Sequence, residues 1–314
     1  MSFSISANST LPSDSSLSPL GPAGSRWLRP PERPRLRGEA GRGERVQLWG
    51  VINLTPDSFY AGSRSAGEEA LNRAAQMLAD GADKIDVGAE STRPGAETIS
   101  ASEQLNVLLP FIDEFVAVHG QNGLRNISID TRDVAVMRAC LDKGVTTIND
   151  VSGGSDEIYR LIGASGAEYV LMHTTGGPMT MQQSAAYDNV TAEVLQYLRE
   201  KSGLLLAAGA KASQIIWDTG IGFGKLAGHN LQLIAQHAQF RRDGYRLLAG
   251  VSRKSFIGKI TGHADPAERL VGTLAVQTYL TLRGLDILRV HDVKEMAETL
   301  AVISAIREYE LQPA

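Results

Sequence analysis

The chain has 314 residues, of which 43% are hydrophobic and 21% charged, an ordinary balance for a globular protein with a sizeable core. Lysine and arginine number 31 against 35 aspartates and glutamates, and the resulting net charge of -4 argues against nucleic acid or a membrane surface as a partner. The single cysteine, Cys140, excludes an internal disulfide and a cysteine-rich metal site and is compatible with a reducing, cytoplasmic location.

The first 44 residues differ in composition from the rest of the chain. They are rich in Ser, Pro, Gly and Arg and have no hydrophobic periodicity, so they cannot bury enough apolar surface to offset the cost of ordering. The basic region and apolar stretch of a secretory signal are missing. An organellar transit peptide is disfavoured because the early stretch contains Asp14 and the later one many prolines. We expect residues 1–44 to be a disordered tail and residues 45–314 to be one folded domain.

Short runs rich in Val and Ile alternate with longer segments of helical period from residue 46 onward. The short runs predict strands at Val46–Asn53, Lys84–Gly88, Asn126–Asp130, Thr146–Asn149, Tyr169–His173, Ile215–Asp218, Leu247–Val251 and Ile287–His291. The longer segments predict helices at Glu68–Asp80, Ala101–His119, Arg132–Lys143, Asp156–Ala164, Asn189–Ala208, His229–Arg242, Pro266–Arg283 and Asp292–Glu310.

Eight strand-then-helix units in about 265 residues indicate a single α/β domain, a (β/α)8 or TIM barrel. A doubly wound open sheet is the alternative. It is disfavoured because the units stop at eight and no GxGxxG follows the first predicted strand. In a (β/α)8 barrel the active site lies at the C-terminal ends of the strands, so the residues that end each strand are the candidates for function.

Polar residues end nearly all of the predicted strands. Any one of them could be a packing or capping residue, and Asp130 and Asn149 could each cap the following helix. So many on one rim nevertheless favour a binding site over a separate structural role for each residue. The set comprises Asn53, Glu90, Asp130, Asn149, His173, Asp218, the Ser252–Lys254 segment, Arg289 and His291.

Positive charge gathers at the last two strands. Arg253 and Lys254 follow the seventh strand, and Arg289 and His291 end the eighth, two residues apart, so that they project to the same side. The loops after these strands often hold phosphate in barrels of this type. The cluster therefore predicts a phosphate-type site.

Hydrogen-bond acceptors gather at strands three, four and six. Asp130, Asn149 and Asp218 could converge on the barrel mouth and accept hydrogen bonds from a ring that carries several N–H donors. Two loops rich in Gly, Pro and Ser, at residues 55–59 and 91–95, follow the first two strands. We expect these loops to be mobile and to bring one aromatic ring, Phe59, and one cation, Arg93, to the site.

Eight motifs, taken together, resemble those of the dihydropteroate synthase family. The match runs in the family's order from about residue 46 to the end of the chain, and the NxTPDSF and ESTRPG pieces are each specific alone. The motifs are Asn53–Phe59 (NLTPDSF), Asp86–Gly95 (DVGAESTRPG), Ser128–Thr131, Ile148–Asp150, Leu171–His173, Asp218–Lys225 (DTGIGFGK), Gly250–Ser255 (GVSRKS) and Arg289–Asp292.

The resemblance implies an enzyme of folate biosynthesis. In this family 6-hydroxymethyl-7,8-dihydropterin pyrophosphate condenses with p-aminobenzoate to give 7,8-dihydropteroate and diphosphate. Mg2+ and cations stabilise the leaving diphosphate, and the arylamine attacks the methylene carbon without a covalent enzyme intermediate. The resemblance also implies small molecules as the substrates, Mg2+ as the cofactor and a homodimer as the usual assembly.

The resemblance also implies a role for individual residues of this chain. The residues that match the family's pterin site are Asp130, Asn149, Asp218, Lys254 and Arg289. Those that match the diphosphate site are Asn53, Thr92, Arg93, Arg289 and His291, and Asn53 also reaches Mg2+. Those that match the p-aminobenzoate site are Phe59, Thr92, Arg93, Pro94, Phe223 and Ser255. Asn53, Lys254, Arg289 and His291 are thereby implied to be catalytic.

Three positions depart from the family pattern. Family members usually carry Asp two residues after the loop phenylalanine, where this chain has Ala61. Thr174 follows the Leu-Met-His of the fifth strand, where the family often has Arg, and Thr219 replaces the usual Pro. None of these changes removes a residue assigned above, and Ala61 bears on the role of the first loop.

Two other functions stay open on the sequence alone. A methyltetrahydrofolate-dependent methyltransferase is a pterin-binding barrel with similar carboxylates. It has no diphosphate to hold, so the Ser252–Lys254 segment and the Arg289-x-His291 pair together disfavour it. A pterin-binding protein without turnover would be signalled by loss of the Asn, Lys or Arg-x-His residues, and all of them are present.

Overall fold

The computed structural model describes residues 45–54, 64–90, 98–175 and 186–310. Eight parallel strands close into one barrel in the order β1 to β8, with β8 paired to β1. The strands are β1 (Gln47–Asn53), β2 (Lys84–Gly88), β3 (Ile127–Asp130), β4 (Thr147–Asp150), β5 (Glu168–Met172), β6 (Ile215–Asp218), β7 (Arg246–Ala249) and β8 (Ile287–Val290). All eight predicted strands and the (β/α)8 fold are confirmed. The predicted tail lies outside the described residues.

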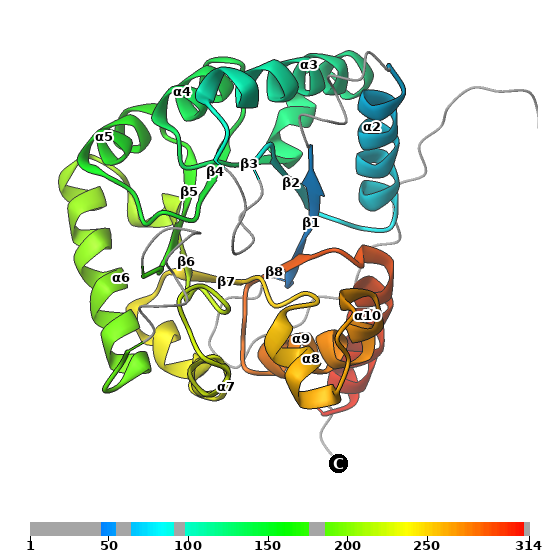
Figure 1. Ribbon diagram of the computed structural model, residues 1–314, viewed down its shortest axis with the longest axis vertical. Helices are drawn as coiled ribbons and strands as arrows, with labels where there is room; N and C mark the ends of the chain where they lie inside the picture. The colour runs from blue at the N-terminus through cyan, green and yellow to red at the C-terminus, as the bar shows by residue number, and fades with distance from the viewer. Residues whose placement is uncertain (1–44, 55–63, 91–97, 176–185, 311–314) are drawn as a thin grey trace, which may run out of the picture.

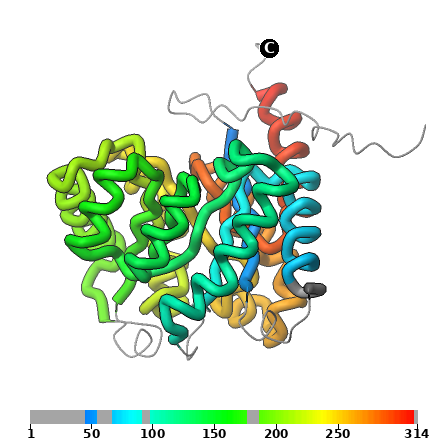
Figure 2. Tube along the Cα trace, turned by 90° about the horizontal axis from the view of Figure 1, so that it is seen from above, coloured from blue at the N-terminus to red at the C-terminus, as the bar shows by residue number. Residues whose placement is uncertain are grey.

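The helices form a ring around the strands, as Figure 1 shows. They are α2 (Arg64–Ala79), α3 (Ala101–His119), α4 (Val134–Asp142), α5 (Asp156–Ser165), α6 (Val190–Ala207), α7 (Ala227–Ala235), α8 (Ser255–Thr261), α9 (Leu270–Leu282) and α10 (Val293–Glu310). Short 3-10 helices are η1 (Gln121–Asn126), η2 (Ala212–Gln214), η3 (His237–Asp243) and η4 (Pro266–Arg269). In the side view of Figure 2 the last turns of α10 project beyond the neighbouring helices. No described helix is long and apolar enough to cross a membrane.

Two predicted helices differ from the structure. The segment predicted as His229–Arg242 is α7 followed by the 3-10 helix η3, and the segment predicted as Pro266–Arg283 is η4 followed by α9. A further helix, α8, was not predicted; it has seven residues and contains Gly258. It is too short to show a helical period.

Local sequence explains where the main helices begin. Ser100 and Glu103 form a capping box at the start of α3, in which each side chain accepts a hydrogen bond from the other residue's backbone N–H. Asp133 caps α4 and Ser155 caps α5. Asp130 and Asn149 are therefore not needed as caps, so helix capping does not explain their presence on the rim.

The barrel interior is layered along its axis. A plug of five apolar side chains, each at most 2% exposed, fills its middle: Trp49, Val170, Ile216, Leu248 and Ile287. Such packing makes the barrel a solid core with no open channel through it. The outward faces of the strands pack against the helices through a larger apolar cluster that includes Phe111 and Phe115 of α3.

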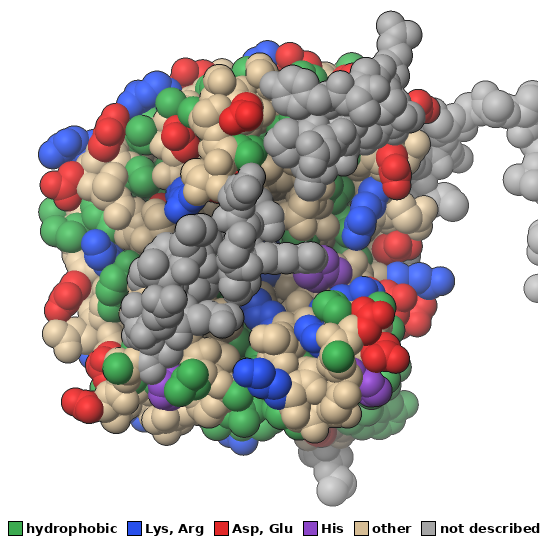
Figure 3. Space-filling model, in the orientation of Figure 1, with side chains coloured by type: hydrophobic (Ala, Val, Ile, Leu, Met, Phe, Trp, Pro, Cys, Tyr) green, Lys and Arg blue, Asp and Glu red, His purple; other side chains and the backbone are tan. Residues whose placement is uncertain are grey.

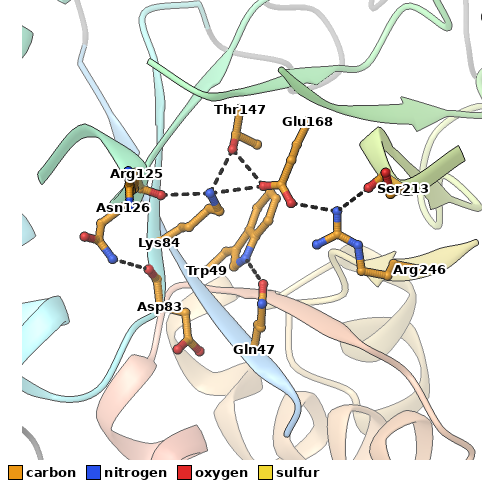
Figure 4. Close-up of polar contacts among 10 residues, drawn as sticks. All are labelled: Gln47, Trp49, Asp83, Lys84, Arg125, Asn126, Thr147, Glu168, Ser213 and Arg246. Atoms are coloured by element: carbon orange, nitrogen blue, oxygen red, sulfur yellow. Dashed lines mark hydrogen bonds and ion pairs between the residues drawn. The ribbon is translucent and has the colours of Figure 1, made fainter. Parts of the chain in front are cut away.

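Below the plug lies a network of polar side chains, which Figure 4 draws and which we call the floor network. Lys84 Nζ donates to Thr147 Oγ1 at 2.8 Å and pairs with Glu168 Oε2 at 3.1 Å. Arg246 Nη2 pairs with the other oxygen of Glu168 at 2.7 Å. One carboxylate thus joins three strands at the N-terminal end of the barrel, the end where residues contribute to stability.

We predict that Glu168→Gln destabilises the fold by about 1–3 kcal/mol. The change leaves Lys84 and Arg246 without a charged partner, and the cost stays below that of a fully buried pair because Glu168 is 28% exposed. Burial raises the pKa of Glu168, but Lys84 and Arg246 together hold it below its ordinary value. The stabilisation is therefore complete above that ordinary value and disappears as the pH falls through the lower folded one.

Urea unfolding of the wild type and Glu168→Gln between acidic and neutral pH measures this difference. Glu114→Gln is the control, because Glu114 lies exposed on α3. Equal stability of wild type and Glu168→Gln at neutral pH would contradict the role of the floor network.

Candidate active site

Above the plug, a guanidinium joins carboxylates from two other strands. Arg289 of β8 donates from Nε to Asp86 Oδ2 and from Nη2 to Asp130 Oδ2. Asp86 and Asp130 are 0% and 4% exposed. Burial would lower the pKa of Arg289, but the two carboxylates outweigh it and raise the pKa. Arg289 therefore stays charged and ties β8 to β2 and β3 across the barrel mouth.

Asp86 is a site residue that the sequence analysis missed. Its Oδ2 also accepts a hydrogen bond from Asn149 Nδ2 at 2.8 Å, so it orients both the cation and the amide predicted to bind ligand. Asp86 Oδ1 and the Oγ of its register partner Ser128 are buried with no hydrogen-bond partner among the described residues. The available signal was a carboxylate in the middle of the strand Lys84–Gly88, between the apolar residues Ile85 and Val87.

Asp218 and Lys254 lie on the other side of the mouth. Asp218 Oδ1 accepts a hydrogen bond from the backbone of Gly220 at 2.7 Å, and Lys254 Nζ donates to the carbonyl oxygen of Ile221. The Lys254 ammonium also lies 4.4 Å from the centre of the Phe223 ring. The structure thus brings Phe223 to Lys254, as the predicted neighbouring sites require.

Burial shifts the pKa values of Asp130, Asp218 and Lys254. It raises the pKa of Asp130 to about 7, although Arg289 acts against the shift. It also raises the pKa of Asp218, where Lys254 opposes it, and lowers the pKa of Lys254 to about 8, where Asp218 opposes it. Burial thus destabilises the charged form of each group. A ligand that offers N–H donors to the carboxylates and an acceptor to the lysine would stabilise those charged forms.

His291 is neutral in this environment. Burial, together with the nearby Arg289, lowers the pKa of His291 to about 4. Its Nδ1 lies 3.0 Å from Ser252 Oγ. His291 therefore offers an anion a hydrogen bond rather than the positive charge that the cluster of basic residues first suggested.

The side chain of Arg253 forms an ion pair outside the cluster around Lys254 and Arg289. Its backbone has φ 57, in the left-handed region, and its side chain pairs with Asp292 at 2.5 Å. Lys254 and Arg289 thus remain as the cations within the mouth among the described residues. Figure 3 shows one end of the barrel, where basic side chains and a histidine gather near the centre.

The remaining predicted residues lie at the rim or outside the described part of the chain. Asn53 is exposed at the end of β1, and Ser255 is exposed at the first position of α8, next to Lys254. Glu90 pairs with Arg132 at 2.8 Å, and His173 contacts Lys225, so neither faces the pocket unpartnered. The residues that lie outside the description are Phe59, Ala61, Thr92, Arg93 and Pro94.

The donor set fits a magnesium ion that arrives with a phosphate. No group of three His, Cys, Asp or Glu side chains in the described ranges could hold a metal. Mg2+ keeps several waters and is often bound by one or two protein oxygens together with substrate phosphates. The amide oxygen of Asn53, exposed beside the mouth, can supply such a ligand.

The family model described as "Pterin binding enzyme" matches residues 49–291. Dihydropteroate synthase from Synechocystis is 40% identical over 84% of this chain and 91% of its own length. The same enzyme from Neisseria meningitidis serogroup B is 41% identical over 85% of this chain and 96% of its own length. This chain belongs to the dihydropteroate synthase family. The family predicted from the motifs is therefore confirmed.

Solved structures of dihydropteroate synthases agree. The Xanthomonas albilineans enzyme with 4-aminobenzoic acid superposes with a TM-score of 0.77 at 35% identity, covering 85% of this chain and 94% of that one. The Yersinia pestis enzyme with a sulfonamide drug gives 0.76 at 33% identity, covering 84% and 94%.

We predict that Asp86→Asn lowers kcat/KM for the pterin substrate by about tenfold to a hundredfold. The change keeps the shape of the side chain but removes the charge that holds Arg289 and the strong acceptor for Asn149. Steady-state kinetics measures the loss, with Asp142→Asn on the exposed surface of α4 as the control. Wild-type kinetics in Asp86→Asn would show that Arg289 is oriented without it.

Proposed function

We propose that this protein is a dihydropteroate synthase that joins 6-hydroxymethyl-7,8-dihydropterin pyrophosphate to p-aminobenzoate, giving 7,8-dihydropteroate and diphosphate. The observation that carries the proposal is the Arg289 guanidinium bound to Asp86 and Asp130 in the barrel mouth, with Asn149 on the same carboxylate. This arrangement places acceptors and a cation together at the barrel mouth, within a chain that belongs to this family.

The pterin ring is proposed to bind at the inner part of the mouth. Asp130, Asn149 and Asp218 offer acceptors to its N–H groups, while Lys254 offers a donor to its carbonyl oxygen or a ring nitrogen. Arg289 packs against the ring. The Lys254 ammonium donates to the Ile221 carbonyl in this structure. The pterin ring would replace that carbonyl as the acceptor.

The diphosphate is proposed to lie toward the rim. Arg289 contributes the charge and neutral His291 a hydrogen bond, while Asn53, Thr92 and Arg93 complete the set. Asn53 would hold Mg2+, which supplies positive charge to the leaving diphosphate when it is bound. Phe223 and Ser255, with Phe59, Thr92, Arg93 and Pro94, are proposed to frame p-aminobenzoate. The Xanthomonas structure with 4-aminobenzoic acid supports a site of this kind.

The reaction exchanges one bond at the pterin methylene for another. The carbon–oxygen bond breaks and its electron pair leaves with the diphosphate, while the amine nitrogen of p-aminobenzoate forms the new bond and loses a proton. Asp130 and Asp218 can stabilise positive charge that develops on the pterin. The protein needs no nucleophile of its own, which agrees with the burial of Cys140 in α4.

One assay tests this function directly. Purified protein with the pterin pyrophosphate, p-aminobenzoate and Mg2+ should form dihydropteroate. Lys254→Ala and Asp218→Ala should each weaken pterin binding by about 1–3 kcal/mol or more, because each leaves a buried polar group unpaired. Lys259→Ala, on an exposed position of α8, should change nothing. Failure of the wild type to form product would refute the function, and normal kinetics in both site variants would refute the residue assignment.

We also propose that the enzyme is a cytoplasmic homodimer. Large apolar side chains lie exposed on α9 and α10, including Val271 at 79%, Val302 at 62% and Ile306 at 57%. Because α9 and α10 are neighbouring helices, we propose that these side chains form the surface that contacts the second copy. A reducing cytoplasm keeps the single thiol unpaired.

Light scattering of the purified protein should give twice the mass of one chain. Val302→Asp should shift the equilibrium toward the monomer, because it introduces a charge on the exposed surface of α10, whereas Leu204→Asp on α6 should not. A wild type that is monomeric at all accessible concentrations would contradict the dimer.

A further inference from the structure

A second buried ammonium lies beside the pocket, and the residue roles given above do not use it. Lys225 is 9% exposed and follows the turn between β6 and α7. Its Nζ donates to the carbonyl oxygens of Gly220 and Phe223, each at 2.9 Å, and lies 3.3 Å from that of His173. His173 Nδ1 lies 3.0 Å away. Lys225 therefore joins the turn at residues 219–224 to the end of β5.

The turn is shaped for this contact. Gly220 has φ 65, and a side-chain carbon at that position would lie 1.9 Å from the carbonyl oxygen of His173 and 3.1 Å from Lys225 Nζ. No residue but glycine can bring the two segments so close. Further along, the N–H of Gly222 donates to Asn230 Oδ1 at 2.8 Å. The turn is thus held by bonds from both sides.

Burying Lys225 in this way carries a free-energy cost. The residue forms no ion pair with any carboxylate in the described part of the chain. Burial lowers the pKa of Lys225 to about 7, although Asp218 acts in the opposite direction. A lysine at a surface position would avoid this penalty. The burial is explained if the ammonium fixes the positions of the Gly220, Phe223 and His173 carbonyl groups.

We propose that Lys225 is a positioning residue that, with His173 as its partner, holds Phe223 against Lys254 and thereby shapes the p-aminobenzoate side of the pocket. The inference rests on the proposed function for the identity of that substrate. Phe223 is the residue in question because Lys225 binds its carbonyl oxygen directly and Lys254 lies over its ring.

The two halves of the site depend on Lys225 to different degrees. Asp218 belongs to β6, where its position follows from the pairing of that strand with Met172 and Leu248. Asp130 and Asn149 are likewise on strands. Phe223 lies in a turn and depends on the bonds that the turn makes. The turn also contacts the pterin side, through Gly220 to Asp218 and Ile221 to Lys254. Strand pairing still holds Asp218, and the pterin ring is proposed to replace Ile221 as the acceptor for Lys254. Removal of the ammonium should therefore disturb p-aminobenzoate binding more than pterin binding.

Lys225→Met tests this asymmetry, because it keeps an unbranched side chain and removes the donor. KM for p-aminobenzoate should rise about tenfold, while KM for the pterin substrate changes by less than about threefold. A general loss of structure would instead raise both. His173→Leu should raise KM for p-aminobenzoate in the same way. His173→Asn should bring KM back toward the wild-type value, because the Asn side-chain oxygen can replace Nδ1 as an acceptor. Lys211→Met, at an exposed position, is the control.

A spectroscopic measurement separates this inference from the proposed function. Fluorine NMR of protein labelled with fluorophenylalanine reports on the seven Phe residues, and Phe223→Leu assigns the signal of interest. That signal should shift or broaden in Lys225→Met and His173→Leu and stay unchanged in Lys211→Met. An inactive wild type would refute the proposed function but leave this readout intact. An unchanged Phe223 signal in Lys225→Met, or an equal rise of both KM values, would overturn the positioning role.

Discussion

The arrangement of the site depends on one buried ionic contact, that of Arg289 with Asp86 and Asp130. Two carboxylates with low exposure could not both stay ionised so deep in the barrel without a cation, because the desolvation of each charge is costly. The cation in turn could not remain there without them. Three strands are thereby held at one relative position, and Asn149 is oriented by the same carboxylate. The remaining polar groups of the mouth are arranged around this contact.

The layers beneath it explain how a charged site can exist inside a small barrel. The apolar plug supplies the packing that charged residues cannot provide, and the floor network closes the opposite end with paired charges. The charged groups of the floor are paired with one another, and those of the mouth centre on Arg289. Residues for chemistry and residues for stability therefore occupy opposite ends of the same strands.

The sequence predicted the fold well because runs of Val and Ile mark buried parallel strands independently of distant contacts. The roles of individual site residues were harder to predict where they depend on neighbours that are distant in the sequence. Asp86 went unassigned because its partner Arg289 is 203 residues away. Arg253 was grouped with the pocket cations, but a left-handed backbone turns it to Asp292. The charge of His291 was open for the same reason, since burial decides its protonation.

The plug also closes the barrel interior, so that the polar groups above it face only the C-terminal end of the strands. Asp86, directly above it, is fully buried, whereas Asn53 and Ser255 at the rim are exposed. Any molecule that reaches the depth of Asp86 must pass the rim, and anything bound at the rim then stands between it and bulk water. A ligand bound at the depth of Asp86 would therefore have to enter before a ligand at the rim and leave after it.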